Sequence, residues 1–307
     1  MFDISVIVCT HNPRSEYLKR VFEALEKQTL PKDRWEMLVI DNLSKEPLAK
    51  NWDLSWHPNA RHVREEDLGL VPARLRGISE SKGSLLVFVD DDNVLKSNYL
   101  EEALKIGSQW PILGAWGGNI EAEIDGKPAP ELEPLVPLLA IRKVTSPRWS
   151  NQTLTGNHAI PIGAGMCIRK AVASKYRDTI VTDTARKKLD RQGTNLASSG
   201  DVDLALTACD AGYGTGLFPE LHVTHLIPNN RIQRDYLLKL EEEVVFGHLL
   251  LDTIRGTPVQ QIAVTERIKA WYSLLRNSGI RRSIIRAHWR ARLRHVKTVN
   301  SMNGNSL

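Results

Sequence analysis

The chain has 307 residues, 42% of them hydrophobic, and a formal net charge of +5, which suffices for one large domain or one domain with an appendage. Three cysteines, Cys9, Cys167 and Cys209, lack paired metal spacing and are too few for a disulfide framework, so a reducing compartment is expected. The sequence shows no signal peptide and no apolar run near the roughly 18 residues of a membrane span, so we expect a cytoplasmic protein, at most peripherally attached to a membrane.

The first part of the chain alternates strand and helix patterns. Short apolar runs rich in β-branched residues predict strands over 4–9, 35–41, 60–64 and 85–90. Amphipathic spacing predicts helices over 15–28 and 67–82. Because these strands lack polar alternation, we expect a parallel sheet that is buried on both faces and has helical crossovers. Such sheets bind ligands beyond the carboxyl ends of their strands, where polar clusters follow three of these runs.

Beyond Ser97 the pattern loosens. Apolar runs that contain glycine predict strands over 112–120 and 162–168, and the proline-rich segment 127–147 between them is expected to form a loop over the site. A helix is predicted over 201–212, where a glycine ends it. Three further helices are expected over 231–254, 259–276 and 280–297.

Three consecutive aspartates, Asp90, Asp91 and Asp92, end the fourth predicted strand. Their charges repel one another and are costly to desolvate, so a cation should neutralise them, most economically a divalent ion with oxygen ligands. In an extended segment Asp90 and Asp92 point the same way and Asp91 points oppositely, which would let Asp90 and Asp92 converge on one ion. A turn or helix-capping role is the alternative.

The acidic run does not fit the common calcium-binding and nucleotide-binding motifs. An EF-hand loop that starts at Asp90 would put Val94 and Leu95 where an oxygen ligand and a glycine belong. A Walker B strand needs an upstream G-x-x-x-x-G-K-[ST] loop, and a dinucleotide-binding oxidoreductase needs G-x-G-x-x-G before the first helix. The sequence has neither of these glycine-rich loops.

Four segments, in this order, resemble the family 2-type glycosyltransferases of the GT-A fold. They are "SVIVCTHNP", "LVIDNLSKE", "DLGLVPARLRGISESKGSLLVFVDDDNVLKSNYL" and "SSGDVDLALTACDAGYGTGLFPELHVTHLIP". The resemblance covers about residues 4–228. It implies an α/β, Rossmann-like and mostly parallel central sheet flanked by helices. We therefore expect a GT-A domain over 1–228, with a nucleotide-binding half (1–110) and an acceptor half (111–228), and a helical C-terminal extension over 229–307.

The resemblance also implies a reaction and its ligands. A sugar would move, with inversion, from a nucleotide-diphosphate sugar to a hydroxyl of a glycan or lipid-linked acceptor, with UDP as the leading nucleotide and Mn²⁺ or Mg²⁺ as the cofactor. Cell-surface glycan assembly in the cytoplasm would be the setting. The implied donor-binding residues are Thr10, Asn12, Asp41, Arg74, Asp90 and Asp91, with Asp41 on the base and Arg74 on the diphosphate.

Three residues carry the remaining implied roles. Asp92 would hold the metal, His225 would approach the metal or the diphosphate, and Asp201 would be the base that acts on the acceptor hydroxyl. Asp203 is a rival base; Asp201 is favoured because it occupies the start of the predicted helix, the family position. Helix capping by Asp201 and a core position for His225 are the structural alternatives.

The sequence departs from the family pattern at two places. Gly200 precedes Asp201 where glutamate is common, and Leu75 follows Arg74 where asparagine is common. The missing glutamate keeps a catalytically inactive nucleotide-sugar-binding protein as an alternative. A nucleotidyltransferase is a weaker one, because no glycine-rich, basic phosphate loop follows the first predicted strand.

Basic residues concentrate at the C-terminus. From Arg276 onward the chain has eight Lys or Arg and no Asp or Glu, so subtracting them from +5 leaves about −3 for the rest. "IRRSIIRAHWRARLRHVK" interleaves these residues with apolar ones at near-helical spacing. We expect either a helix that lies on anionic lipid or a docking helix with a solvated basic face. Nucleic-acid binding is unlikely, because no recognisable module accompanies the charge.

Overall fold

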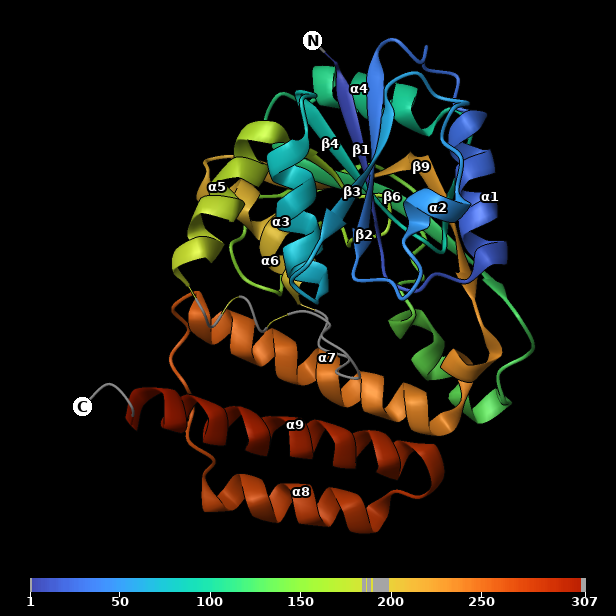
Figure 1. Cartoon of the computed structure of the whole chain (residues 1–307). Helices are drawn as coiled ribbons and strands as arrows, with labels where there is room; N and C mark the ends of the chain where they lie inside the picture. The colour runs from blue at the N-terminus through green and yellow to red at the C-terminus, as the bar shows by residue number, and fades with distance from the viewer. Residues whose placement is uncertain (1, 184–185, 187–188, 190–198, 305–307) are drawn as a thin grey trace.

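The computed structural model describes residues 2–183, 186, 189 and 199–304. Within this part of the chain, one mixed sheet of nine strands forms the centre of the molecule, with helices on both faces and a layer of long helices beyond one end (Figure 1). The strands are β1 (Ile4–Thr10), β2 (Trp35–Asn42), β3 (Ala60–Glu65), β4 (Leu85–Asp90), β5 (Asn93–Leu95), β6 (Leu113–Ile124), β7 (Arg148–Ser150), β8 (Cys167–Arg169) and β9 (Gly214–Ile227).

The N-terminal half of the sheet is parallel, as predicted, and its strand order is β3-β2-β1-β4. All seven residues of β1 are buried, because α1 (Ser15–Glu26) covers one face of this half and α3 (Leu70–Glu80) covers the other. The short α2 (Leu48–Asn51) joins β2 to β3. The β-branched runs thus form strands that are enclosed on both sides, the condition under which polar alternation disappears.

The C-terminal half of the sheet is mixed. After α4 (Tyr99–Gln109), β6 pairs with β9 in parallel, whereas β8 lies antiparallel between β4 and β6. The predicted strand over 162–168 is wrong for most of its length, since β8 begins only at Cys167. Gly165 turns the chain before it with a φ of +75°, and a Cβ there would lie 2.6 Å from the Tyr99 hydroxyl.

Strand β9 fixes the position of a predicted site residue. It pairs on one side with β6 and on the other with the short β5, whose register sets Asn93 opposite His225. Since Asn93 directly follows the aspartate triplet, this pairing brings a histidine more than a hundred residues away to the end of β4.

The proline-rich segment covers the site, as expected, but part of it is regular. Residues Pro130–Leu138 form a 3₁₀ helix, η1, which packs Leu132 and Leu135 against Leu237 and Leu240 of α7 (Arg234–Ile254). Its internal prolines lack amide hydrogens, which disfavours a regular α-helix there.

The remaining helices include those predicted for the C-terminal part, and one, α5, that the sequence patterns did not predict. They are α5 (Lys170–Thr182), α6 (Gly200–Asp210), the 3₁₀ turn η3 (Asn229–Ile232), α7, α8 (Val264–Arg276) and α9 (Gly279–Gly304). Helix α9 lies between α7 and α8 (Figure 1). It buries Ala287, Ala291 and His295, which are spaced four residues apart along one face. None of the helices in the described residues is both long and apolar enough to cross a membrane.

Candidate active site

A cavity of about 690 Å³ opens beyond the carboxyl ends of β1 and β4, where a sheet of this kind is expected to bind its ligand. Its walls come from these strand ends, from α3, from the segment that follows η1, from the start of α6 and from α7. The volume falls within the range of about 300–1,000 Å³ that is typical of small-molecule sites. Helix α7 belongs to the predicted C-terminal extension, so that extension helps to build the site.

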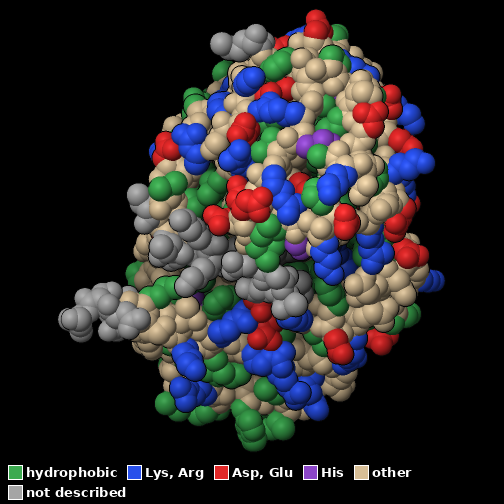
Figure 2. All heavy atoms as spheres, viewed as in Figure 1, with side chains coloured by type: hydrophobic (Ala, Val, Ile, Leu, Met, Phe, Trp, Pro, Cys, Tyr) green, Lys and Arg blue, Asp and Glu red, His purple; other side chains and the backbone are tan. Residues whose placement is uncertain are grey.

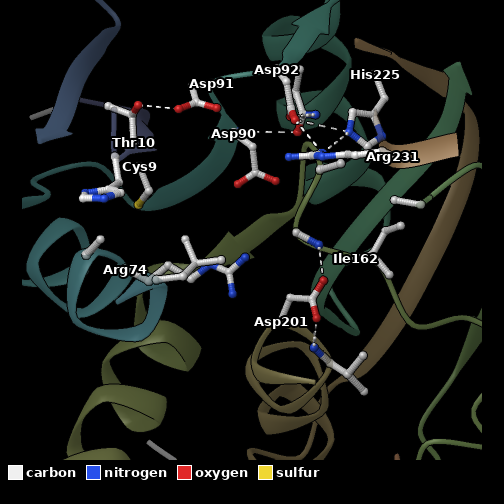
Figure 3. Close-up of a pocket in the computed structure, with 18 of the residues that line it drawn as sticks. Cys9, Thr10, Arg74, Asp90, Asp91, Asp92, Ile162, Asp201, His225 and Arg231 are labelled. Carbon is white, nitrogen blue, oxygen red and sulfur yellow. Dashed lines mark hydrogen bonds and ion pairs between the residues drawn. The ribbon is translucent and has the colours of Figure 1, made fainter. Parts of the chain in front are cut away.

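The three aspartates point in different directions (Figure 3). The predicted alternation is wrong because β4 ends at Asp90 and the chain turns at Asp91 and Asp92. Asp90 faces the cavity, whereas Asp91 accepts a hydrogen bond from the Thr10 hydroxyl at the end of β1. Protein surrounds most of the Asp91 carboxyl; this burial, reinforced by the charges of Asp92 and Asp90, raises its pKa to about 7.

Asp92 faces His225 and Arg231 on the other side of the cavity (Figure 3). The Arg231 Nη1 donates to Asp92 Oδ2 at 3.0 Å and lies 3.5 Å from His225 Nε2, which is itself 3.4 Å from Asp92 Oδ2. His225 Nδ1 lies 2.9 Å from the backbone oxygen of Leu139. Because a carbonyl oxygen only accepts, Nδ1 carries the hydrogen of the neutral ring and Nε2 presents a lone pair.

Asp92 and His225 carry the kinds of ligand atom that a divalent cation binds. A carboxylate oxygen and an imidazole nitrogen suit Mn²⁺, and a backbone carbonyl on the far nitrogen is the usual way to orient a ligating histidine. Two acceptor atoms that face each other also need a positive group between them, and the guanidinium of Arg231 meets that need here. In the described part of the chain, no three His, Cys, Asp or Glu side chains converge enough to hold a metal. Asp92 and His225 thus fit part of such a site.

Arg74 projects from α3 into the cavity and is only 4% exposed (Figure 3). The chain passes close to it at Gly163, where a Cβ would lie 2.6 Å from Arg74 Nη2. Glycine at this position therefore makes room for the guanidinium, whereas Gly165 is needed for its positive φ and its contact with Tyr99.

Asp201 lies in the first turn of α6, two residues after the N-cap residue Ser199, so it does not cap the helix itself. Its Oδ2 accepts the Gly163 amide hydrogen at 2.8 Å, and its Oδ1 accepts that of Val202 at 2.8 Å. The rival Asp203 is fully buried between two arginines and does not line the cavity. The structure therefore presents Asp201, and not Asp203, to a ligand.

Asp41 and Asn12 lie apart from the cavity lining. The Asp41 carboxylate is 3% exposed and accepts hydrogen bonds from the amides of Ser44 and Leu48 and from Arg64. Although burial opposes it, these bonds lower the pKa of Asp41. The side-chain oxygen of Asn12 accepts the Lys45 amide hydrogen at 2.9 Å. Both residues hold the loop after β2 in place, and their contact with a nucleotide base stays a prediction.

The cavity is also lined by Arg142, Arg231 and His248, which the sequence patterns do not indicate as site residues. Arg142 donates to the Ile160 backbone oxygen at 2.5 Å, and His248 projects from α7 near Asp201. Burial lowers the pKa of His248 and so favours the neutral ring, although the negative charge of Asp201 acts in the opposite direction. Arg231 follows His225 by only six residues, and this proximity to a predicted ligand is the one signal that could have found it.

Comparisons with known proteins agree with this geometry. The model of glycosyl transferase family 2 matches residues 5–176. The chain is 26% identical over 214 residues to glycosyltransferase AglE of Haloferax volcanii, a match that covers 68% of this chain and 62% of that relative. It is 30% identical over 108 residues to an uncharacterized glycosyltransferase of Haemophilus influenzae, covering 35% of each. The chain thus spans less than two thirds of the length of these curated relatives.

Solved structures share the fold. S. aureus TarS 1-349 in complex with UDP-GlcNAc has a TM-score of 0.52 at 14% identity, covering 88% of this chain and 70% of that one. GalNAc-T7 with UDP, GalNAc and Mn²⁺ has a TM-score of 0.53 at 16% identity, covering 88% and 54%. The GT-A fold is thereby confirmed. Since the family match spans more than half of the chain and includes Thr10, Arg74 and the aspartate triplet, the protein belongs to glycosyl transferase family 2.

Proposed function

We propose that the protein is a metal-dependent, inverting glycosyltransferase that moves a sugar from a nucleotide-diphosphate sugar, foremost a UDP-sugar, to a hydroxyl of a glycan or lipid-linked acceptor. The observation that carries the proposal is the composition of the cavity wall: two cationic side chains, Arg74 and Arg231, line it together with the carboxylate of Asp201 (Figure 3). Transfer of a sugar from a diphosphate needs a positive side for the leaving group and a base for the acceptor. S. aureus TarS, a relative in fold, has been solved with UDP-GlcNAc and with UDP.

The leaving group is a nucleoside diphosphate, which gains negative charge as the sugar–phosphate bond breaks. In the proposal, Arg74 and Arg231 bind its phosphate oxygens through charge-assisted hydrogen bonds. Asp92 and His225 would hold a Mn²⁺ or Mg²⁺ ion, which would supply Lewis-acid stabilisation of the same charge. Asp90, which faces the same space, would contact the ribose or that ion.

The acceptor hydroxyl is a weak nucleophile while it keeps its proton. Asp201 would take this proton as the hydroxyl oxygen attacks the anomeric carbon, and the bonding electrons of the sugar–phosphate bond would leave with the diphosphate. The amide hydrogens of Gly163 and Val202 orient the carboxylate for this step. Because base and leaving group would lie on opposite faces of the sugar, the anomeric configuration would invert. General-base catalysis contributes about 10²–10⁴-fold.

A cytoplasmic role in cell-surface glycan assembly is also part of the proposal. Its support is the family to which the chain belongs.

Thermal unfolding with a panel of nucleotide-sugars, with and without Mn²⁺, tests the proposal. A ligand that binds the folded state stabilises it by RT ln(1 + [L]/Kd), about 2.7 kcal/mol at a hundredfold excess over Kd. We expect one nucleotide-sugar to raise the midpoint strongly, more so with metal, and to be hydrolysed or transferred in a product assay. If no donor raises the midpoint, the cavity is not a donor site. If one binds without hydrolysis or transfer to any acceptor, the inactive binding protein is the better description.

A further inference from the structure

Helix α8 directs its apolar face away from the protein. Five of its side chains are 54–71% exposed, and they are Val264, Ile268, Trp271, Tyr272 and Leu275. At 3.6 residues per turn these positions fall within an arc of about 100°. The less exposed residues of the helix, among them Glu266 and Leu274, lie on the opposite side, toward α9. A helix that stabilises a water-soluble surface normally has the reverse arrangement, so the exposed stripe needs an explanation.

Positive charge borders this stripe. Arg267, Lys269 and Arg276 of α8 are exposed beside it. The single acid of the helix, Glu266, faces α9 and pairs with Arg292 at 2.7 Å. Figure 2 shows apolar side chains with Lys and Arg around them at the end of the molecule that α8 forms. An apolar band with cationic flanks and aromatic side chains is the composition of helices that lie in the interface of anionic membranes.

Charge decides between the two candidate occupants. If a second copy of the chain packed against the stripe, the cationic borders of the two helices would meet and repel each other. Anionic headgroups would instead neutralise them, while the acyl boundary would cover Ile268, Trp271 and Leu275. We propose that α8 docks this protein onto a membrane surface that contains anionic lipid, with the helix axis in the plane of the interface.

This assignment moves the expected membrane contact from one helix to another. The basic helix α9 lies between α7 and α8 (Figure 1). Several of its arginines form ion pairs with α7, such as Arg294 with Glu243 at 2.7 Å and Arg290 with Glu242 at 2.7 Å. Its first turns add exposed cations, Arg281 and Arg282, near the end of α8. The cavity lies on the other side of α7, so membrane docking and catalysis are separable in experiment.

Vesicle flotation with the full chain tests the docking. We expect the protein to float with phosphatidylcholine vesicles that contain phosphatidylglycerol, and much less with phosphatidylcholine alone or in high salt. Replacing the stripe (Ile268→Ser, Trp271→Ser, Leu275→Ser) should lower the partition coefficient by at least about tenfold. Replacing the border (Arg267→Gln, Lys269→Gln, Arg276→Gln) should lower it on the order of a hundredfold, since each cation contributes about fivefold at an anionic surface.

A matched control replaces exposed apolar residues elsewhere. The variant Ile112→Ser, Val181→Ser changes side chains that are 46% and 64% exposed and should float like the unmodified protein. Circular dichroism checks that every variant is folded. Equal flotation of the stripe variant and the unmodified protein would overturn the proposal. So would a protein that ignores anionic vesicles but forms a dimer that the stripe variant dissociates, because a second copy would then cover α8.

Discussion

Two aspartates in the first turn of α6 have opposite environments. Asp203 is fully buried and pairs with Arg186 at 2.9 Å and with Arg255 at 2.8 Å. Asp201 lines the cavity, and its carboxylate accepts hydrogen bonds from the backbone amides of Gly163 and Val202. Positions i and i+2 of a helix do not share a face, so one side of the turn meets the interior and the other meets the ligand space.

The difference shows what makes a carboxylate available for chemistry. Asp203 is fully buried and already neutralises two cations, so a substrate can neither reach it nor give it a proton. Asp201 is held in place by the neutral amide groups of Gly163 and Val202, and it stays in reach of a ligand. We therefore assign stability to one aspartate and reactivity to the other, and the following predictions test that division.

The largest expected effect concerns Asp201. Asp201→Asn keeps the shape but cannot take a proton, so transfer should fall by about 10²–10⁴-fold while the unfolding midpoint stays near that of the unmodified protein. Turnover with the best donor, followed by product detection, measures the loss, and calorimetric titration of the donor shows whether binding survives. A collapse of donor affinity would mean that Asp201 binds the donor and is not the base.

Asp203→Asn should have the reverse outcome. It leaves the buried guanidinium groups of Arg186 and Arg255 without their shared anion, and breaking a buried pair costs about 3–5 kcal/mol. Urea unfolding measures this loss. Asp210→Asn is the matched control, because it removes a more exposed partner of Arg255 and should cost less than about 1 kcal/mol. If Asp203→Asn were as stable as the unmodified protein, the structural role that we assign to Asp203 would be wrong.

A buried histidine far from α6 in the sequence, His57, should make the stability of the protein depend on acid pH. Burial, and to a lesser extent the charge of Lys32, lowers the pKa of His57 from 6.5 to about 4. Between these values the unfolded chain binds a proton that the folded chain does not, so stability rises with pH and is lost as the pH falls from 6.5 toward 4. The loss should be on the order of 3 kcal/mol. His57→Gln should flatten this slope in urea titrations, and an unchanged slope would contradict the assignment.

Asp92 lies between the two extremes, since it pairs with an arginine and also faces the cavity. If Arg231 occupies the position of a divalent cation, Arg231→Met should raise the affinity for Mn²⁺ by about tenfold or more, because a hydrogen bond to a charged group contributes about 1.5–3 kcal/mol. Calorimetric titration without donor measures this affinity. Arg231→Lys, which keeps the charge, is the control and should change it far less. A lower Mn²⁺ affinity in Arg231→Met would show that the two cations do not compete.

Local patterns predicted the part of the site that depends on strand ends. Asp90 ends a short, unambiguous strand, and parallel strands bring their carboxyl ends to one edge. The ordered family segments added Thr10, Arg74, Asp201 and His225, which the structure places in the same cavity. Asp41 and Asn12 belong to the same kind of strand end, but their side chains bond to the loop after β2 instead of facing the cavity.

The rest depended on long-range geometry. The register that sets Asn93 opposite His225 also brings Arg231 to Asp92, and no local pattern encodes a pairing across more than a hundred residues. Strand β4 ends at Asp90 as its apolar pattern predicts, but that pattern does not encode the turn at Asp91 and Asp92 that separates the three carboxylates. For α8, periodicity predicts an apolar face but not the direction in which that face points. The direction depends on which side of α8 packs against α9.

The anomeric configuration of the first product tests the proposed mechanism most directly. If Asp201 is the base and the diphosphate leaves from the opposite face of the sugar, the acceptor attacks from the face that Asp201 lines. Proton NMR of freshly formed product should therefore show a configuration inverted from that of the donor. A product with the donor's configuration would contradict Asp201 as the base and the account built on it.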